Sequence, residues 1–181
     1  MIEPQKVTKL KYVVLMAGAL MALAACDSPE QADERDALVK ELYETGGREH
    51  VVPFLSTCVD SLRAGAVDRD AFIALGYDVG QREFRDGSRY MHKELSDFAL
   101  GSGIVVLDGR VSPSQCNLNS HYSLSDKALE ENIDHMIRVK GYSGKARSGV
   151  FGDGKTLIQI RTFTKYPGRG LVNTVQLKRL R

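Results

Sequence analysis

The residues that could act as nucleophiles, bases or metal ligands are spread along this sequence without a recognised spacing. No pair of histidines has the HxH or HExxH spacing that places two ligands on one metal ion, so no metal site is predicted. Ser102 stands between two glycines but lacks the GxSxG pattern of a nucleophile elbow. No catalytic residue is predicted, while a serine–histidine–aspartate site assembled from distant segments stays open. The four histidines are His50, His92, His121 and His135.

One stretch matches a phosphate-binding pattern. Gly149 to Thr156 fits GxxxxGK[ST], but that loop requires a following helix, whose N-terminus holds the phosphate. Here Leu157 to Ile160 consists of strand-forming residues, and Asp153-Gly154 suits a hairpin turn. The pattern therefore indicates a β-hairpin, and no nucleotide or other cofactor is expected.

Two of the three cysteines are expected to form a disulfide. Cys58 shares the apolar face of a helical segment with Leu55, Val59 and Leu62, and Cys116 falls on the apolar face of an alternating strand. An oxidising compartment would favour their pairing, which would stabilise the fold by about 4 kcal/mol through loop closure. The alternative, a reactive or metal-bound thiol, lacks a CxxC motif or a histidine at ligand spacing.

The third cysteine ends a stretch with the layout of an export signal. Lys6, Lys9 and Lys11 form a basic segment, and Tyr12 to Leu23 is an apolar run. That run is shorter than the roughly 20 residues of a membrane-spanning helix but suits a signal peptide. Small residues then complete the order Leu-Ala-Ala-Cys, which ends at Cys26.

This order resembles the lipobox of bacterial lipoproteins, and the resemblance covers residues 1–27. In that family the cysteine thiol receives a diacylglyceryl group, the peptide is cut before it, and the new amine is acylated. The resemblance implies a lipoprotein signal peptide over 1–25 and lipidation of Cys26. Several acyl chains anchor a protein stably, whereas one binds only marginally. The competing interpretation is an ordinary signal peptide, or a retained helix, with a chance cysteine.

The same resemblance implies an orientation and a location. The mature chain, 26–181, would be a single periplasm-facing domain in which 26–30 is a possible tether. Asp27 directly after the cysteine implies retention at the inner membrane, with the inner leaflet of the outer membrane as the alternative. The bilayer is then a partner through acylated Cys26.

Charge is distributed unevenly along the expected mature chain. Residues 26–137 carry 11 basic and 21 acidic side chains, whereas 138–181 carries 11 basic side chains and a single acid, Asp153. A surface for anionic lipid headgroups or an acidic envelope protein is one interpretation, and nucleic acid is not expected. The others are solubilisation of an exposed hairpin and edge strand, or pairing with the acidic helices. The candidate binding residues are Lys145, Arg147, Lys155, Arg161, Lys165, Arg169, Lys178, Arg179 and Arg181.

Apolar periodicity and turn signals predict an α+β domain, with N-terminal helices packed on a mostly antiparallel sheet and one further helix before a C-terminal hairpin. Asp108-Gly109 and Pro167-Gly168 are read as turns. The predicted helices cover 29–45, 53–62, 69–75 and 125–140, and the predicted strands cover 88–95, 97–100, 103–108, 115–123, 156–164 and 171–179.

These observations favour one function class over two others. The leading hypothesis is a membrane-anchored envelope lipoprotein that acts as a non-catalytic binding module. The alternatives are an envelope hydrolase with an unrecognised site and a protein inhibitor. A hydrophobic content of 43% argues against a disordered chain.

Overall fold

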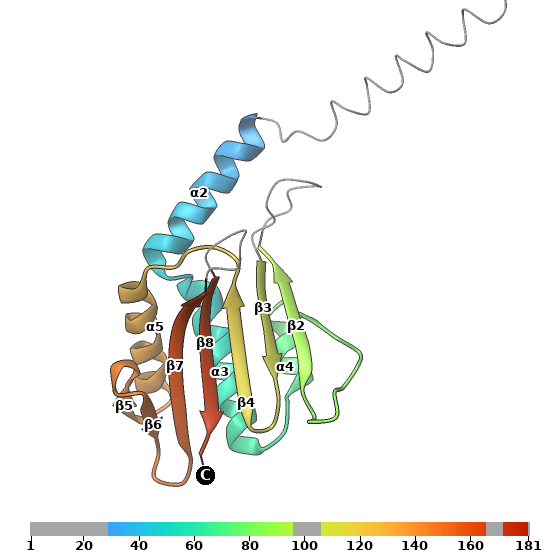
Figure 1. Ribbon diagram of the computed structural model, residues 1–181, viewed down its shortest axis with the longest axis vertical. Helices are drawn as coiled ribbons and strands as arrows, with labels where there is room; N and C mark the ends of the chain where they lie inside the picture. The colour runs from blue at the N-terminus through green and yellow to red at the C-terminus, as the bar shows by residue number, and fades with distance from the viewer. Residues whose placement is uncertain (1–28, 96–105, 166–171, 181) are drawn as a thin grey trace, which may run out of the picture.

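The computed structural model describes residues 29–95, 106–165 and 172–180, and these form an α+β domain around one antiparallel sheet (Figure 1). The predicted signal peptide, Cys26, the strand over 97–100 and the turn at Pro167-Gly168 lie outside the described residues. None of the described helices is long and apolar enough to cross a membrane. The predicted fold class is confirmed.

The helices begin and end close to the predicted residues, with one exception. Ser125 caps α5 by accepting a hydrogen bond from the Ala128 amide, and Asp68 caps α4 in the same way. Gly46 and Gly47 separate α2 from α3, and both adopt the left-handed conformation that favours glycine. The described helices are α2 (Pro29–Thr45), α3 (Arg48–Ala64), α4 (Arg69–Ala74) and α5 (Asp126–Val139).

The start of α3 differs from the prediction, because the helix contains Pro53 and does not begin there. Its first turns carry Val51, which is fully buried on the same stripe as Leu55 and Cys58. Proline costs one hydrogen bond inside a helix. Burial of Val51 offsets part of that cost, so the helix extends back to Gly47.

The sheet has eight strands, all paired antiparallel, in the order β1-β2-β3-β4-β8-β7-β6-β5. The chain builds it twice from the same unit. In each half a long helix precedes four strands, and the halves meet where β4 pairs with β8. The strands are β1 (Asp78–Val79), β2 (Arg89–Glu94), β3 (Val106–Val111), β4 (Gln115–Ser120), β5 (Ser143–Lys145), β6 (Val150–Gly152), β7 (Leu157–Lys165) and β8 (Val172–Arg179).

The core lies between the sheet and the pair α3 and α5, which pack against each other on one face of it. The disulfide between Cys58 and Cys116 is confirmed, with a Cα–Cα distance of 6.0 Å. Both cysteines are fully buried. The bond therefore fixes α3 to β4 at the centre of the sheet.

The predicted turn at Asp108-Gly109 is wrong, because both residues lie in the middle of β3. Gly109 allows α3 to pack closely against β3. A Cβ atom there would lie 2.7 Å from Cζ of Phe54 and 2.5 Å from the carbonyl oxygen of Asn117. The glycine lets the phenyl ring of α3 rest directly on the strand, so β3 continues to Val111.

The segment between α5 and β7 contains two short strands that the sequence did not indicate, β5 and β6. The expected hairpin turn is present. The side chain of Asp153 accepts hydrogen bonds from the amides of Lys155 (3.0 Å) and Thr156 (2.8 Å). Strand β7 follows, and the GxxxxGK[ST] match is a β-hairpin without the helix that a phosphate loop needs.

Candidate functional site

One face of the sheet carries no helix of the described part of the chain, and it faces the viewer in Figure 1, with α3 behind the strands. We call it the open face. Strand alternation sets its composition, because Cys116 and Leu118 point to the core while Asn117 and Asn119 point outward. Its outward polar and aromatic residues are Tyr90, His92, Glu94, Asp108, Arg110, Gln115, Asn117, Asn119, His121, Thr174, Gln176, Lys178, Gln159, Arg161, Phe163 and Lys145.

A hydrogen-bonded network centred on Asp108 occupies the end of this face near α2. Asp108 is only 8% exposed, and its carboxylate accepts from Nδ2 of Asn119 at 2.6 Å and from Nε2 of His121. Oδ1 of Asn119 accepts in turn from the hydroxyl of Thr174 at 2.9 Å. Burial, together with the nearby Asp108 carboxylate, raises the pKa of Tyr90 above its ordinary value. The network joins side chains of β2, β3, β4 and β8, and so fixes their orientation.

A second network lies one cross-strand row further along. Oδ1 of Asn117 accepts from Nε2 of Gln176 at 3.1 Å and from Nε2 of Gln115 at 3.3 Å. These three amides are half-buried, and each keeps donors or acceptors for a ligand, because an amide side chain offers two N–H groups and two lone pairs. The centre of the open face is therefore polar and ordered.

Arg110 borders this centre on β3 and is held in place on three sides. Its guanidinium donates to Oγ of Ser88 at 2.7 Å and to Oδ2 of Asp86 at 3.0 Å, and it lies 4.6 Å from the ring centroid of Phe84. The hydrogen bonds from Ser88 and the charge of Arg110 lower the pKa of Asp86. A polar hollow of about 170 Å³ separates this cluster from Gln115 and Asn117. Arg110 therefore has its charge partner within the domain.

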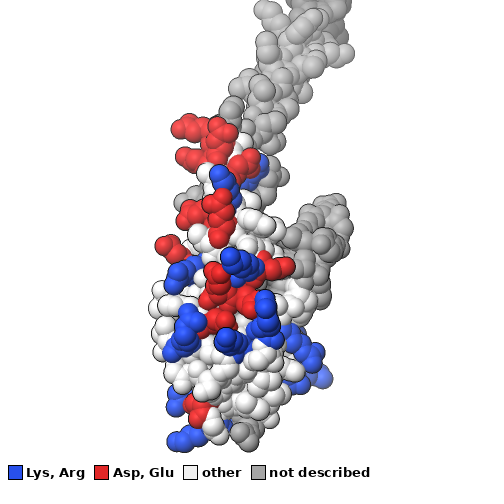
Figure 2. Space-filling view, turned by 90° about the vertical axis from the view of Figure 1, so that its left-hand side faces the viewer, with Lys and Arg blue, Asp and Glu red and all other residues white. Residues whose placement is uncertain are grey.

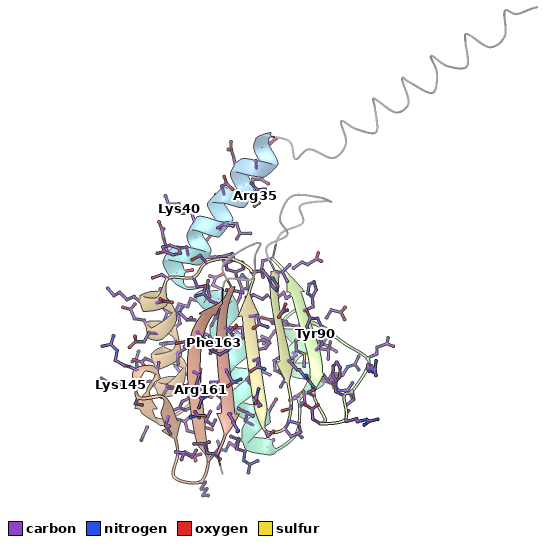
Figure 3. All side chains as sticks on the ribbon, viewed as in Figure 1. Arg35, Lys40, Tyr90, Lys145, Arg161 and Phe163 are labelled. Carbon is purple, nitrogen blue, oxygen red and sulfur yellow. A yellow bond between two sulfur atoms is a disulfide. The ribbon has the colours of Figure 1, made fainter. Side chains whose placement is uncertain are left out.

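Exposed aromatic rings lie on either side of the amides, as Figure 3 shows for Tyr90 and Phe163. Tyr90 on β2 is 44% exposed and Phe163 on β7 is 36% exposed. Four strand spacings separate β2 from β7, which is about 19 Å at 4.8 Å per spacing. The aromatic rings thus form the rim of the open face, and the amides form its centre.

The predicted basic residues divide into a group on the open face and a group used elsewhere. Lys145, Arg161 and Lys178 share the open face by strand register, and no acidic side chain of the described residues pairs with them. Arg147 instead pairs with Glu130 at 3.1 Å, and Arg179 donates to the carbonyl of Leu62 at 3.1 Å.

The remaining predicted basic residues do not belong to the group on the open face. Lys155 is exposed in the β6–β7 turn, away from the strand rows. The side chain of Lys165 lies outside the described part of the chain, as do Arg169 and Arg181. The alternative that basic residues pair with the acidic helices holds for Arg147 and for Lys140, whose partner is Asp60 on α3.

Of the residues of the open face, sequence reasoning named only basic ones as candidates, and it missed the amides, the aromatic rings and the Asp108 network. The alternation that puts Cys116 on the apolar face of its strand also puts Asn119 and His121 on the opposite face. The neighbouring polar face of β3 was not predicted, because Asp108-Gly109 was read as a turn. Continuing the strand through Gly109 would have placed Asp108 opposite Asn119.

The open face offers a ligand hydrogen-bonding amides, exposed aromatic rings and cations. An aspartate that orients a histidine is half of a hydrolytic arrangement, but catalysis also needs a nucleophile within hydrogen-bond reach of the ring. Among the described residues, the only hydrogen-bond partner of the His121 ring is Asp108. Nor do the described residues contain a cluster of three histidine, cysteine or carboxylate side chains that could hold a metal ion.

A larger hollow of about 300 Å³ lies on the helical side, between α5 and β7. Leu129, Ile133 and Ile160 line it, and Glu130 and Arg147 are at its edge, where they pair with each other. Phe163 and Thr174 of the open face also belong to its lining, so the hollow adjoins that face at the end of β7.

Comparison of the chain with known proteins finds no matching family model, no similar curated protein and no similar solved structure. The functional argument therefore starts from the open face.

Proposed function

We propose that this chain is a membrane-anchored envelope lipoprotein that acts as a non-catalytic binding module and takes its ligand on the open face. One observation carries the proposal. A sheet face that no described helix covers presents an ordered polar centre, exposed aromatic rings and three cations that no acidic side chain among the described residues pairs with. Ordered polar groups lose little entropy when a ligand binds, which favours recognition.

The anchoring part of the proposal rests on the lipobox resemblance and on the charge of α2. Cys26 precedes Pro29, the first residue of α2, by three positions. This helix of 17 residues is about 25 Å long at 1.5 Å per residue. It carries six acidic and two basic side chains, and Figure 2 shows the acidic ones gathered above the main body. Negative charge is repelled by anionic headgroups, so α2 acts as a stalk that holds the domain away from the bilayer.

The proposed location is the periplasmic face of the inner membrane, because Asp27 follows the lipidated cysteine. The outer membrane is the alternative. Replacing Cys26 by Ser should abolish partitioning of the protein into the detergent phase, and a Cys26→Ser protein that partitions like the wild type would contradict the anchor. An Asp27→Ser protein that moves to the outer membrane on fractionation would support the sorting role.

Site-specific photocrosslinking in the native envelope tests the binding surface. A photoreactive residue at Tyr90 or Phe163 should give high-mass adducts, because both side chains are exposed on the open face. Matched controls are Ile73 on α4 and Val139 on α5, which are exposed outside that face. Adducts from the control positions alone would refute the binding surface. An envelope hydrolase captured at Tyr90 would identify the binding module as a protein inhibitor.

A further inference from the structure

We infer that the ligand of the open face is an acidic glycan strand, that is, a polymer of sugar rings that carries carboxylates. This inference rests on the proposed function, since it names the ligand class of the same surface. Three features carry it: the spacing of the unpaired cations, the amides between them, and the position of the aromatic rings.

The cations define the charge of the ligand. Arg161 pairs in register with Gln176, and Lys178 is two residues further along β8. Such diagonal neighbours lie about 7–8 Å apart. Lys145 lies on the same face three strands from β8, which is about 14 Å. Positive groups that are separated in this way suit isolated carboxylates along a polymer better than one compact phosphate group.

The acidic side chains of the open face do not neutralise these cations. Asp108 is buried and already accepts hydrogen bonds from Asn119 and His121. Glu94 lies at the end of β2, where it pairs with His92 at 3.4 Å. Among the described residues, the charge left without a partner over β7 and β8 is therefore positive, and an anionic ligand is complementary to it.

The amides and aromatic rings define the neutral part of the ligand. Sugar hydroxyl and acetamido groups both donate and accept hydrogen bonds, and so do the side chains of Gln115, Asn117 and Gln176. The C–H faces of sugar rings pack on exposed aromatic rings such as Tyr90 and Phe163. A strand lying across the sheet from β2 to β7 would contact both rings and the amides between them.

The distribution of polar and aromatic side chains on the open face is the reverse of that in a protein–protein interface. Stable interfaces bury an apolar or aromatic centre inside a polar rim, whereas here amides lie at the centre and aromatic rings at the rim. A peptide strand would add at a sheet edge, and the described edge strands β1 and β5 are only two and three residues long. Contact with the anchoring bilayer is disfavoured by the acidic stalk.

The test measures cosedimentation of the acylated full-length mature protein, in neutral detergent, with purified cell-wall sacculi. These are amino-sugar polymers cross-linked by short peptides, and the peptides carry the free carboxylates. The comparison ligands are the same sacculi with their carboxylates amidated, neutral chitin, and anionic phospholipid vesicles. We expect binding to intact sacculi and about tenfold weaker binding to both neutral polymers, a difference of about 1.4 kcal/mol.

The variants separate the surface from net charge. Arg161→Gln with Lys178→Gln should weaken binding to intact sacculi about tenfold. The matched control, Lys127→Gln with Arg138→Gln on exposed positions of α5, removes the same charge and should leave binding unchanged. Tyr90→Ala should weaken binding to all sugar polymers alike. Equal losses in the two double variants would overturn the inference.

The outcomes also separate this inference from the proposed function. Crosslinks from Tyr90 to a protein, without binding to sacculi, would overturn the glycan and leave the binding surface standing. Stronger binding to anionic vesicles than to sacculi would assign the cations to lipid headgroups and also overturn the glycan. Absence of both crosslinks and sacculus binding would refute the glycan and the binding surface together.

Discussion

A long helix that precedes four strands occurs twice in the described residues, with the short helix α4 added before the strands of the first copy. The two copies bury their long helices differently. In the first, α3 buries Phe54, Leu55 and Leu62 completely, and Cys58 fixes it to the sheet. In the second, α5 has no disulfide in the described residues, and a hollow of about 300 Å³ remains between it and β7. The first half is therefore expected to be the rigid part of the fold.

The two halves also differ on the open face. The first half supplies buried Asp108 and the hydrogen bonds around it, whereas the second supplies the exposed cations Arg161, Lys178 and Lys145. In the proposed binding surface, the fixed polar network would orient a ligand and the solvated cations would attract it. If the proposed function holds, the first copy contributes the ordered polar groups of the binding surface and the second contributes its cations.

Truncating one core residue in each helix tests this division and should have the largest effect. Phe54 packs on Phe72 and Tyr77, with ring centroids 5.2 and 5.0 Å away, and Phe54→Ala should lower the free energy of unfolding by about 3–5 kcal/mol. Ile133→Ala should lie near the lower end of the usual range, about 2 kcal/mol, because the neighbouring hollow gives the site room to relax. Urea unfolding measures both. A larger loss for Ile133→Ala would reverse the assignment of the rigid half.

Removing the disulfide should have the next largest effect. Cys58→Ala with Cys116→Ala should lower the free energy of unfolding by about 2–4 kcal/mol, because the bond closes a loop of 58 residues in the unfolded chain. Thermal unfolding with and without reductant measures it, and unreduced protein should have no titratable thiol at either position. Two free thiols in the folded, unreduced protein would contradict the bond.

The disulfide is also the clearest case in which the sequence was sufficient. A helical period placed Cys58 on a buried stripe, and an alternating period placed Cys116 on the buried face of a strand. Both periods extend over enough residues to be recognised. The caps Ser125 and Asp68 were predictable for a related reason, because a cap needs only one side chain and the backbone amide three residues later.

Features that depend on contacts between distant segments were not predictable. Gly109 resembles a turn residue until the ring of Phe54, 55 positions earlier in the sequence, is known to occupy the space above it. Strands β1, β5 and β6 are too short to show alternation, and glycine stands inside two of them. The pairing of His121 with Asp108 depends on the β3–β4 register, which the misread turn concealed.

Removing one amide from the Asp108 network should have a smaller effect than breaking the core. Asn119→Ala deprives the buried carboxylate of a donor and should lower the free energy of unfolding by about 1–3 kcal/mol, because a buried acceptor is left partly unsatisfied. The matched control is Asn117→Ala, whose partners Gln115 and Gln176 are half-buried amides that water can reach. It should cost less than about 1 kcal/mol. Equal losses for the two variants would show that the network does not order the open face.

The smallest expected effect is a pH dependence in the first half, at the start of α3. Burial, followed by the positive charge of Lys93, lowers the pKa of His50 below its ordinary value of 6.5, although Glu49 and Glu41 oppose the shift. The unfolded chain then binds a proton at His50 more readily than the folded chain does. Its contribution to stability is therefore complete above about pH 6.5 and is lost as the pH falls through the lowered pKa.

Nuclear magnetic resonance titration of the His50 ring should give a midpoint below 6.5, and His50→Gln should lose less stability than the wild type between about pH 7.5 and pH 5.5. Lys93→Met provides the internal check. It removes the charge that helps to lower the pKa, so the midpoint should rise, while stability also falls because Nζ of Lys93 donates to the carbonyl of Leu75 at 2.7 Å. A His50 midpoint at or above 6.5 in the wild type would show that His50 does not make the protein less stable at low pH.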